Sequence, residues 1–190
     1  MSRTRSTTVL AILKDGRGAM ASDGQVTMGE TVAKRGAVKV RALFEGEVLV
    51  GFAGGAADAL TLFEKFEGHL ERYRGNLRRA TVEMAREWRN DRILRRLEAM
   101  LLVMDRASIF TVSGNGDVIE GEEGSAAVGS GAPYALSAAR ALLRHTDLPP
   151  ESVCREAMTL AGEICIYTND HVTLLALDGS PEDAPDHEEN

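Results

Sequence analysis

The order in which strand-like and helix-like segments follow one another is the feature that most constrains the fold of this chain. Strands occupy the first quarter, two helices follow, more strands come next, then two further helices and a final strand. The apolar periodicity predicts strands at 7–13, 18–22, 38–44, 48–53, 100–104, 108–112, 118–119, 125–128 and 171–177, and helices at 56–73, 77–100, 134–144 and 151–163.

Strands that come in groups favour antiparallel pairing, whereas strict alternation of strands and helices favours a parallel sheet. Asp15-Gly16 and Gly114–Asp117 are typical of tight turns between antiparallel strands. Residues 25–36 are expected to form a loop excursion with short extended pieces. Two antiparallel sheets face to face, each covered outside by two helices, would bury every apolar face. The sequence therefore predicts an α+β fold, a four-layer α-β-β-α sandwich.

Length and composition indicate one soluble domain with a substantial core. The chain has 190 residues, of which 44% are hydrophobic, and its net charge is −7, which argues against a general nucleic-acid binder. Cys154 and Cys165 make no disulfide framework and lack metal-ligand spacing, which suits a reducing compartment. No apolar run is long enough to span a membrane, so we expect a cytoplasmic protein without membrane or nucleic-acid partners.

Both ends of the chain differ from the segment between them. Residues 1–6 are basic and too short for a secretory signal, so we interpret them as a leader that is removed on maturation. Residues 178–190 are acidic, contain prolines and lack large apolar side chains, which predicts disorder. The predicted functional domain is therefore 7–177.

Thr7 is the candidate on which the functional hypothesis depends. Cleavage before Thr7 would place a nucleophilic hydroxyl and a basic α-amine on one residue, a recognised catalytic combination. The α-amine suits this role because its ordinary pKa, about 7.7–8.0, lies near working pH. Thr-Thr-Val is also typical of an ordinary first strand, and Thr8 competes with Thr7 as the mature first residue.

A set of motifs that occur together and in order strengthens this hypothesis. They are Thr7-Thr8, Ser22-Asp23-Gly24-Gln25, Lys39-Val40-Arg41, Gly51–Gly55, Gly114–Asp117, Gly129-Ser130-Gly131 with Pro133-Tyr134, and Gly162–Asn169. This set resembles the HslV (ClpQ) family, the peptidase subunits of bacterial ATP-dependent proteases, and is similar more distantly to proteasome β-subunits. The resemblance covers residues 7–177 and leaves out both ends.

The resemblance implies an N-terminal-nucleophile hydrolase sandwich, in agreement with the segment order. It also implies a double ring of two hexamers that encloses a proteolytic chamber. A hexameric AAA+ unfoldase of the HslU type would use ATP to deliver protein substrates. The chain itself has no Gly-x-x-x-x-Gly-Lys-Ser/Thr phosphate-binding loop, which is consistent with ATP being used by that partner.

Roles for individual residues follow from the resemblance. Thr7 would be the nucleophile, with Lys39 beside its hydroxyl and Asp23 paired with Lys39. The alternative for Lys39 and Asp23 is an ordinary surface charge. Gly51 would offer its backbone N–H as an oxyanion hole, or else would allow close packing against the sheet. Ser130 would hydrogen-bond the Thr7 amine, or else would cap the following helix.

A monovalent-cation site is also implied by the resemblance. Gly162, Cys165 and Thr168 match positions at which the family binds Na⁺ through backbone carbonyls. Backbone ligands leave almost no side-chain signature, so the residues themselves add no independent support.

Two features suggest other functions and are explained more simply. The Arg-rich helical stretch is interleaved with Glu83, Glu87, Asp91 and Glu98, which is typical of a solvated or subunit-contact face. The four histidines lack zinc-protease spacing. The alternatives that stay open are a stand-alone N-terminal-nucleophile amidohydrolase and a non-catalytic ring subunit.

Overall fold

The computed structural model describes residues 7–92, 94–97 and 99–177. The strands are β1 (Thr8–Lys14), β2 (Arg17–Ser22), β3 (Val26–Met28), β4 (Thr31–Lys34), β5 (Val40–Leu43), β6 (Val48–Ala53), β7 (Met100–Met104), β8 (Ile109–Ser113), β9 (Val118–Glu120), β10 (Ser125–Gly129) and β11 (Thr173–Ala176). The helices are α1 (Ala56–Arg72), α2 (Leu77–Asn90), the short 3₁₀ helix η1 (Leu94–Arg96), α3 (Ala132–His145) and α4 (Pro150–Ile164).

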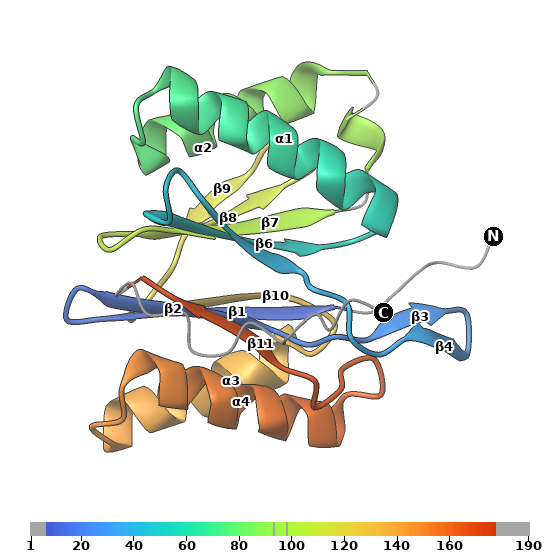
Figure 1. The fold of residues 1–190 in the computed structure, drawn as a ribbon, viewed down its shortest axis with the longest axis vertical. Coiled ribbons are helices and arrows are strands. Elements are labelled where there is room, and N and C mark those ends of the chain that lie inside the picture. Colours follow the sequence, from blue (N-terminus) through green and yellow to red (C-terminus); the bar gives the residue numbers. More distant parts are fainter. Residues whose placement is uncertain (1–6, 93, 98, 178–190) are drawn as a thin grey trace, which may run out of the picture.

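Two antiparallel sheets lie face to face, and each carries a pair of helices on its outer side (Figure 1). The strand order is β10-β1-β2-β11 in one sheet and β5-β6-β7-β8-β9 in the other. Helices α3 and α4 cover the first sheet, and α1 and α2 cover the second. The predicted four-layer α-β-β-α fold is therefore confirmed.

The first hairpin sets the register of the four-stranded sheet. Asp15 and Gly16 both have positive φ, 54° and 75°, as a two-residue turn that follows the strand twist requires. The turn pairs Lys14 with Arg17 and carries the register along to Val9 and Ser22. The open end of this hairpin therefore brings residues 7 and 8 close to residues 22 and 23.

Three apolar clusters fill the spaces between the four layers. One lies between the sheets and includes Val9, Met20, Leu49 and Leu102. The other two lie between each sheet and its helices. The cluster under α1 and α2 includes Trp88 and Phe66, and the smaller cluster under α3 and α4 includes Met158 and Ala135. The inner strands of the two sheets are thus buried on two faces, which explains the fully buried run in β6, whereas β5 and β9 at the edges of their sheet carry exposed residues.

One predicted helix is shorter than expected. The helical pattern extends to 100, but α2 ends at Asn90 and β7 begins at Met100. The chain turns because Asp91 Oδ1 accepts a hydrogen bond from Leu94 N, at 3.0 Å, and Leu94 O accepts one from Trp88 Nε1, at 2.9 Å. These bonds stabilise η1 after α2, and the pattern of apolar residues alone does not reveal them.

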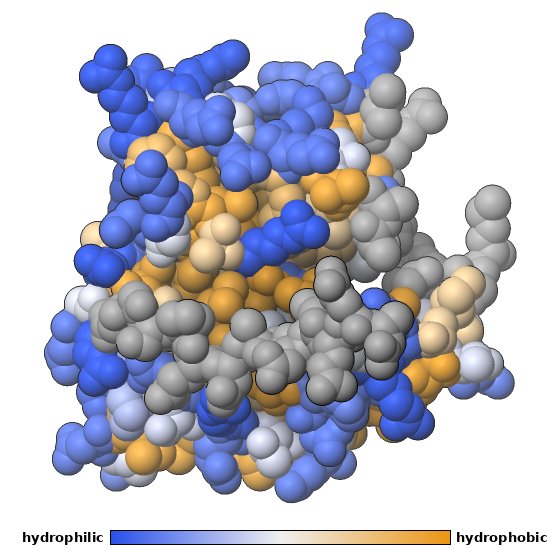
Figure 2. Space-filling model, in the orientation of Figure 1, coloured by the Kyte–Doolittle hydropathy of each residue, from blue (hydrophilic) through white to orange (hydrophobic). Residues whose placement is uncertain are grey.

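The excursion at 25–36 forms a separate two-stranded sheet, β3-β4, beside the ends of the large sheets. The predicted leader and the predicted acidic tail lie outside the described residues. Among the described helices, none has the length and apolar character needed to cross a membrane. On the face of the molecule that is viewed in Figure 1 and Figure 2, apolar side chains gather across the middle, between the polar surfaces of the two helix pairs.

Candidate active site

Thr7 lies immediately before β1, at the end of the sandwich where three segments meet. The residue is 5% exposed. Its carbonyl accepts a hydrogen bond from Ser130 N, at 2.8 Å, and the carbonyl of Thr8 accepts one from Asp23 N, at 3.1 Å. Thr7 is therefore held between the turn that follows β10 and the residues that follow β2.

Asp23 and Lys39 form a buried ion pair at the same end of the sheets. Lys39 Nζ lies 2.8 Å from Asp23 Oδ1, and the two side chains are 8% and 0% exposed. Lys39 Nζ also donates to Gln25 O, at 2.6 Å. The alternative of ordinary surface charges is therefore excluded for both residues.

The Asp23 carboxylate is surrounded by hydrogen-bond donors. Its Oδ1 accepts from Thr8 N, at 2.7 Å, as well as from Lys39, and its Oδ2 accepts from Gln25 N, at 2.8 Å. Burying a charge is costly unless it is paired and hydrogen-bonded, and these contacts meet that requirement. Asp23 thus fixes both the ammonium group and the backbone beside Thr7.

The Lys39 ammonium group experiences opposing electrostatic effects. Burial lowers the pKa of Lys39 from its ordinary value, while the charge of Asp23 and its hydrogen bond act in the opposite direction. Burial has the larger effect, so the pKa of Lys39 is lowered. A cation in this position would favour loss of a proton from a neighbouring hydroxyl or amine.

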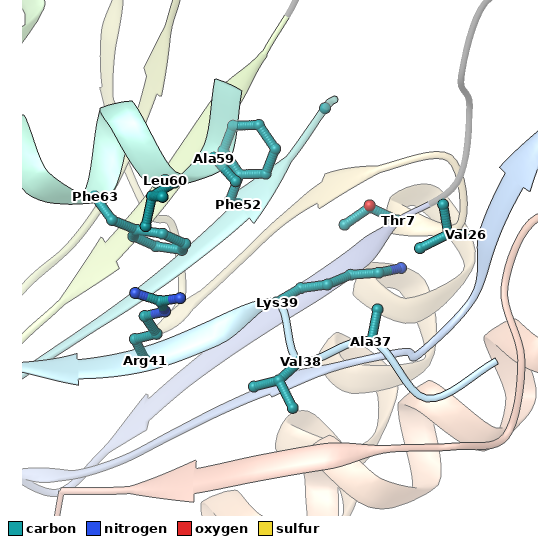
Figure 3. Close-up of a pocket in the computed structure, with 11 residues that line it drawn as sticks. Thr7, Val26, Ala37, Val38, Lys39, Arg41, Phe52, Ala59, Leu60 and Phe63 are labelled. Carbon is teal, nitrogen blue, oxygen red and sulfur yellow. The ribbon is translucent and has the colours of Figure 1, made fainter. Parts of the chain in front are cut away.

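A pocket of about 240 Å³ opens beside Thr7. Figure 3 shows Lys39 extending across it towards the part of the pocket that Thr7 lines. Apart from these two residues and Arg41, the lining is mostly apolar: Val26, Ala37, Val38, Phe52, Gly54, Ala59, Leu60 and Phe63. The guanidinium of Arg41 lies 5.1 Å from the centre of the Phe63 ring. A peptide side chain of apolar character fits such a surface.

The structure does not bring Gly51 to this pocket. Gly51 pairs with Val40 on one side and Leu102 on the other, so its backbone faces neighbouring strands. A Cβ at this position would meet Val9 Cγ1 at 2.5 Å, which agrees with the alternative role in close packing. The glycine that lines the pocket is Gly54, which follows the end of β6 and has a φ of +153°.

Sequence reasoning missed Gly54, although a signal was present. A Gly-Gly pair directly after a buried strand marks backbone whose amides no longer pair within the sheet. Gly54 stands one residue beyond Ala53, the last residue of β6 that pairs with β7. Its amide is therefore the better candidate for an oxyanion donor.

Ser130 contacts Thr7 through its backbone, as described above. The N-cap of α3 is Gly131, so Ser130 does not take the capping role that was its alternative. Because Ser130 lies next to Thr7, a hydrogen bond between its hydroxyl and the Thr7 amine is proposed below.

Gly162, Cys165 and Thr168 lie together at the C-terminal end of α4 and in the turn that follows. Helix C-termini carry carbonyls without helical partners and the negative end of the helix dipole, which suits a cation. Cys165 O accepts from Thr168 N, at 3.0 Å, and retains a second lone pair. Carbonyl oxygens are the kind of ligand that hard cations take, so Na⁺ binding by these three residues is carried forward as a proposal. Cys154 and Cys165 are both free and buried.

Comparisons with known proteins place this chain in a family. The sequence model for proteasome subunits matches residues 4–177. The chain is 60% identical over 167 residues to the ATP-dependent protease subunit HslV of Syntrophobacter fumaroxidans, spanning 88% of this chain and 93% of that one. The chain belongs to the HslV family. The HslV of Desulfovibrio desulfuricans is 58% identical over 175 residues, which span 92% of this chain and 99% of that protein.

Solved structures agree with membership of the HslV family. The crystal structure of eukaryotic HslV from Trypanosoma brucei matches with a TM-score of 0.85 and 40% identity, over 89% of this chain and 98% of that one. Thiobacillus denitrificans BPH matches with a TM-score of 0.68 and 24% identity, over 92% of this chain and 100% of that one. At that identity the second match supports the fold alone.

Proposed function

We propose that this chain is the threonine-type endopeptidase subunit of an ATP-dependent protease that degrades unfolded proteins. The observation that carries the proposal is the buried Lys39–Asp23 pair beside Thr7, in a pocket lined by apolar side chains. Membership of the HslV family supports a peptidase whose relatives are named ATP-dependent protease subunits. Removal of residues 1–6 would expose the Thr7 amine.

In the proposed reaction, the Thr7 hydroxyl oxygen attacks the scissile carbonyl carbon while the Thr7 α-amine takes the hydroxyl proton. The tetrahedral intermediate is stabilised by a backbone amide, for which Gly54 replaces Gly51 as the candidate. Collapse breaks the C–N bond, and the proton held by the α-amine passes to the leaving amine. Water then attacks the ester carbonyl and gives a proton to the same amine; the bond from the acyl carbon to the Thr7 oxygen breaks, and that oxygen takes the proton back from the amine.

Lys39 and Ser130 would support the Thr7 amine and hydroxyl in this reaction. The Lys39 ammonium favours the deprotonated forms of both groups, and Asp23 holds that ammonium in place. Ser130 would hydrogen-bond the amine and relay its proton. Na⁺, bound by the carbonyls of Gly162, Cys165 and Thr168, would stabilise the turn after α4.

The proposed assembly is a double ring of two hexamers in the cytoplasm, served by an HslU-type hexameric ATPase. The partner would use ATP to unfold protein substrates and pass them to Thr7. Relatives that are named subunits of an ATP-dependent protease support this arrangement. A native mass close to that of twelve processed chains would test it.

The nucleophile assignment is tested by Thr7→Ala. We expect this variant to lose peptide hydrolysis, because it lacks the attacking hydroxyl, and to assemble as the wild type does. Thr159→Val is a control, since Thr159 is exposed and its hydroxyl donates to Arg155 O within its own helix. Full activity of Thr7→Ala would refute the assignment.

The two alternatives give different results in the same assays. A stand-alone amidohydrolase would cleave small amides equally with or without an HslU-type ATPase and ATP. A non-catalytic ring subunit would retain residues 1–6 and show no hydrolysis. The intact mass of purified wild type and of Thr7→Ala, measured side by side, distinguishes these results and shows whether removal of the leader depends on Thr7.

A further inference from the structure

Two buried threonine hydroxyls meet behind the nucleophile. Thr8 Oγ1 and Thr168 Oγ1 lie 2.8 Å apart, although the residues are 160 positions apart in the chain. The two residues are 0% and 4% exposed. Thr8 Oγ1 also accepts a hydrogen bond from Gly131 N, at 2.9 Å. The residue that follows Thr7 is therefore held by its side chain from two other segments.

The packing around this pair leaves no spare room. A Cβ on Gly131 would lie 2.4 Å from Thr8 Oγ1 and 2.6 Å from Thr168 Oγ1, closer than real Cβ contacts. The glycine thus allows its own amide and both hydroxyls to come together at one point. The contact is a specific hydrogen-bonded junction and not a loose meeting of side chains.

The same turn after α4 also supports the loop that carries Asp23. Asn169 Oδ1 accepts a hydrogen bond from Gly24 N, at 2.9 Å, and Ile166 O accepts one from Gln25 Nε2, at 2.9 Å. Gln25 O in turn accepts from Lys39 Nζ. The turn therefore bonds to residues next to Thr7 and Asp23 at three points: the Thr8 hydroxyl, the Gly24 backbone amide and the Gln25 side-chain amide.

We propose that the Thr168 hydroxyl is a positioning residue for the Thr7 nucleophile and acts through Thr8. This inference deepens the proposed function and rests on it. Thr8 is covalently joined to Thr7, and its N–H donates to Asp23 Oδ1 at 2.7 Å. Rotation of Thr8 would therefore displace the nucleophile and also disturb the hydrogen bond from Thr8 N to Asp23.

We expect removal of the Thr168 hydroxyl to disturb the orientation of Thr8, and hence of Thr7, without reducing packing. Valine at position 168 keeps the shape of threonine but places a methyl group against the Thr8 hydroxyl, which then retains only the Gly131 contact. Small misplacements of reacting groups reduce the rate of the chemical step far more than they reduce substrate binding. Thr168 does not line the pocket, so binding of a peptide has no direct contact to lose.

The test compares Thr168→Val with Thr168→Ser in the full, processed assembly on one fluorogenic peptide amide. We expect Thr168→Val to lower kcat by about 10- to 100-fold with KM within about threefold. Thr168→Ser retains the hydroxyl, so it should recover most of the wild-type kcat. Thr159→Val, which changes an exposed threonine of α4, is the matched control and should behave as the wild type.

Each outcome separates this inference from the proposed function. Wild-type kcat in Thr168→Val, or an equal loss in Thr168→Ser, would overturn the positioning role. If Thr168→Val fails to assemble, Thr168→Ala removes the hydroxyl without a new methyl contact and carries the same prediction. A wild-type protein that hydrolyses no peptide with its unfoldase would instead refute the proposed function.

Discussion

Lys39 carries its ammonium group in a place almost closed to water, and Asp23 compensates for that burial. Val38 and Arg41 nearby are exposed, and apolar and charged residue types alternate along residues 38–41 as they do in an ordinary edge strand. Local sequence therefore allows a surface lysine here. The burial arises because the segment before β5 crosses the end of the four-stranded sheet. There, Asp23 Oδ1 and Gln25 O accept hydrogen bonds from the ammonium group.

The lowered pKa of Lys39 leads to a prediction about pH. We expect kcat to fall on the alkaline side below pH 10.5, the ordinary lysine value, because loss of the proton removes the cation beside Thr7. The measurement is kcat from neutral pH to about 10.5, with circular dichroism on the same samples. A kcat that stays level across this range would contradict the prediction.

Unfolding driven by Lys39 does not account for such a fall. Between the lowered pKa and 10.5, the unfolded chain holds a proton on Lys39 that the folded chain has lost. The free energy of unfolding contributed by this group therefore rises with pH across that window. The circular dichroism signal is the control for unfolding from other groups.

Helix α2 shows how local signals set where an element begins. Gly75 and Asn76 break the helical pattern, and the Asn76 side chain accepts a hydrogen bond from Arg79 N at 2.9 Å. Its apolar side, which includes Met84 and Trp88, is buried against the five-stranded sheet. The end of α2 instead depends on two hydrogen bonds that residue periodicity does not predict: from Leu94 N to the Asp91 side chain, and from Trp88 Nε1 to Leu94 O.

Asn76→Ala tests the cap directly. We expect a loss of about 1 kcal/mol in the free energy of unfolding, because one N–H of the first turn loses its partner. Asn90→Ala, at the exposed other end of α2, is the control and should change stability by less than about 0.5 kcal/mol. Urea denaturation of both variants gives the comparison. Equal effects would mean that the Asn76 cap contributes nothing specific.

At the scale of the whole molecule, the two sheets are joined by the apolar cluster between them. Met20 from β2 is fully buried in this cluster, with Val9 and Leu102. Met28 in β3 is 63% exposed. The same residue type therefore occurs at the centre of the sandwich and on its outer hairpin, which gives a matched pair for testing what holds the layers together.

We expect Met20→Ala to cost about 2–5 kcal/mol in the free energy of unfolding, because it opens a cavity between the sheets. Met28→Ala should change stability by less than about 0.5 kcal/mol. Thermal and urea unfolding measure both. A small loss for Met20→Ala would mean that the sheets close around the missing side chain.

Local patterns in the sequence predict the layers and most of their elements. Grouped strands, the Asp15-Gly16 turn and the helical periods around Phe66 and Met158 are local signals, and each was found in the structure at or near its predicted place. Motif order also indicated Thr7, Asp23 and Lys39, and the structure places these three at one end of the sandwich.

Which groups of those motifs face the pocket, and which pack elsewhere, depends on the packing of distant segments. Gly51 and Gly54 are three residues apart in one motif, but sheet pairing on both sides turns the first away while the second lies beyond the strand end. The contact of Thr8 with Thr168 joins residues 160 positions apart, and no local pattern encodes it. Periodicity fixes which face of an element is buried, whereas the partner of a buried polar group depends on how distant segments are brought together.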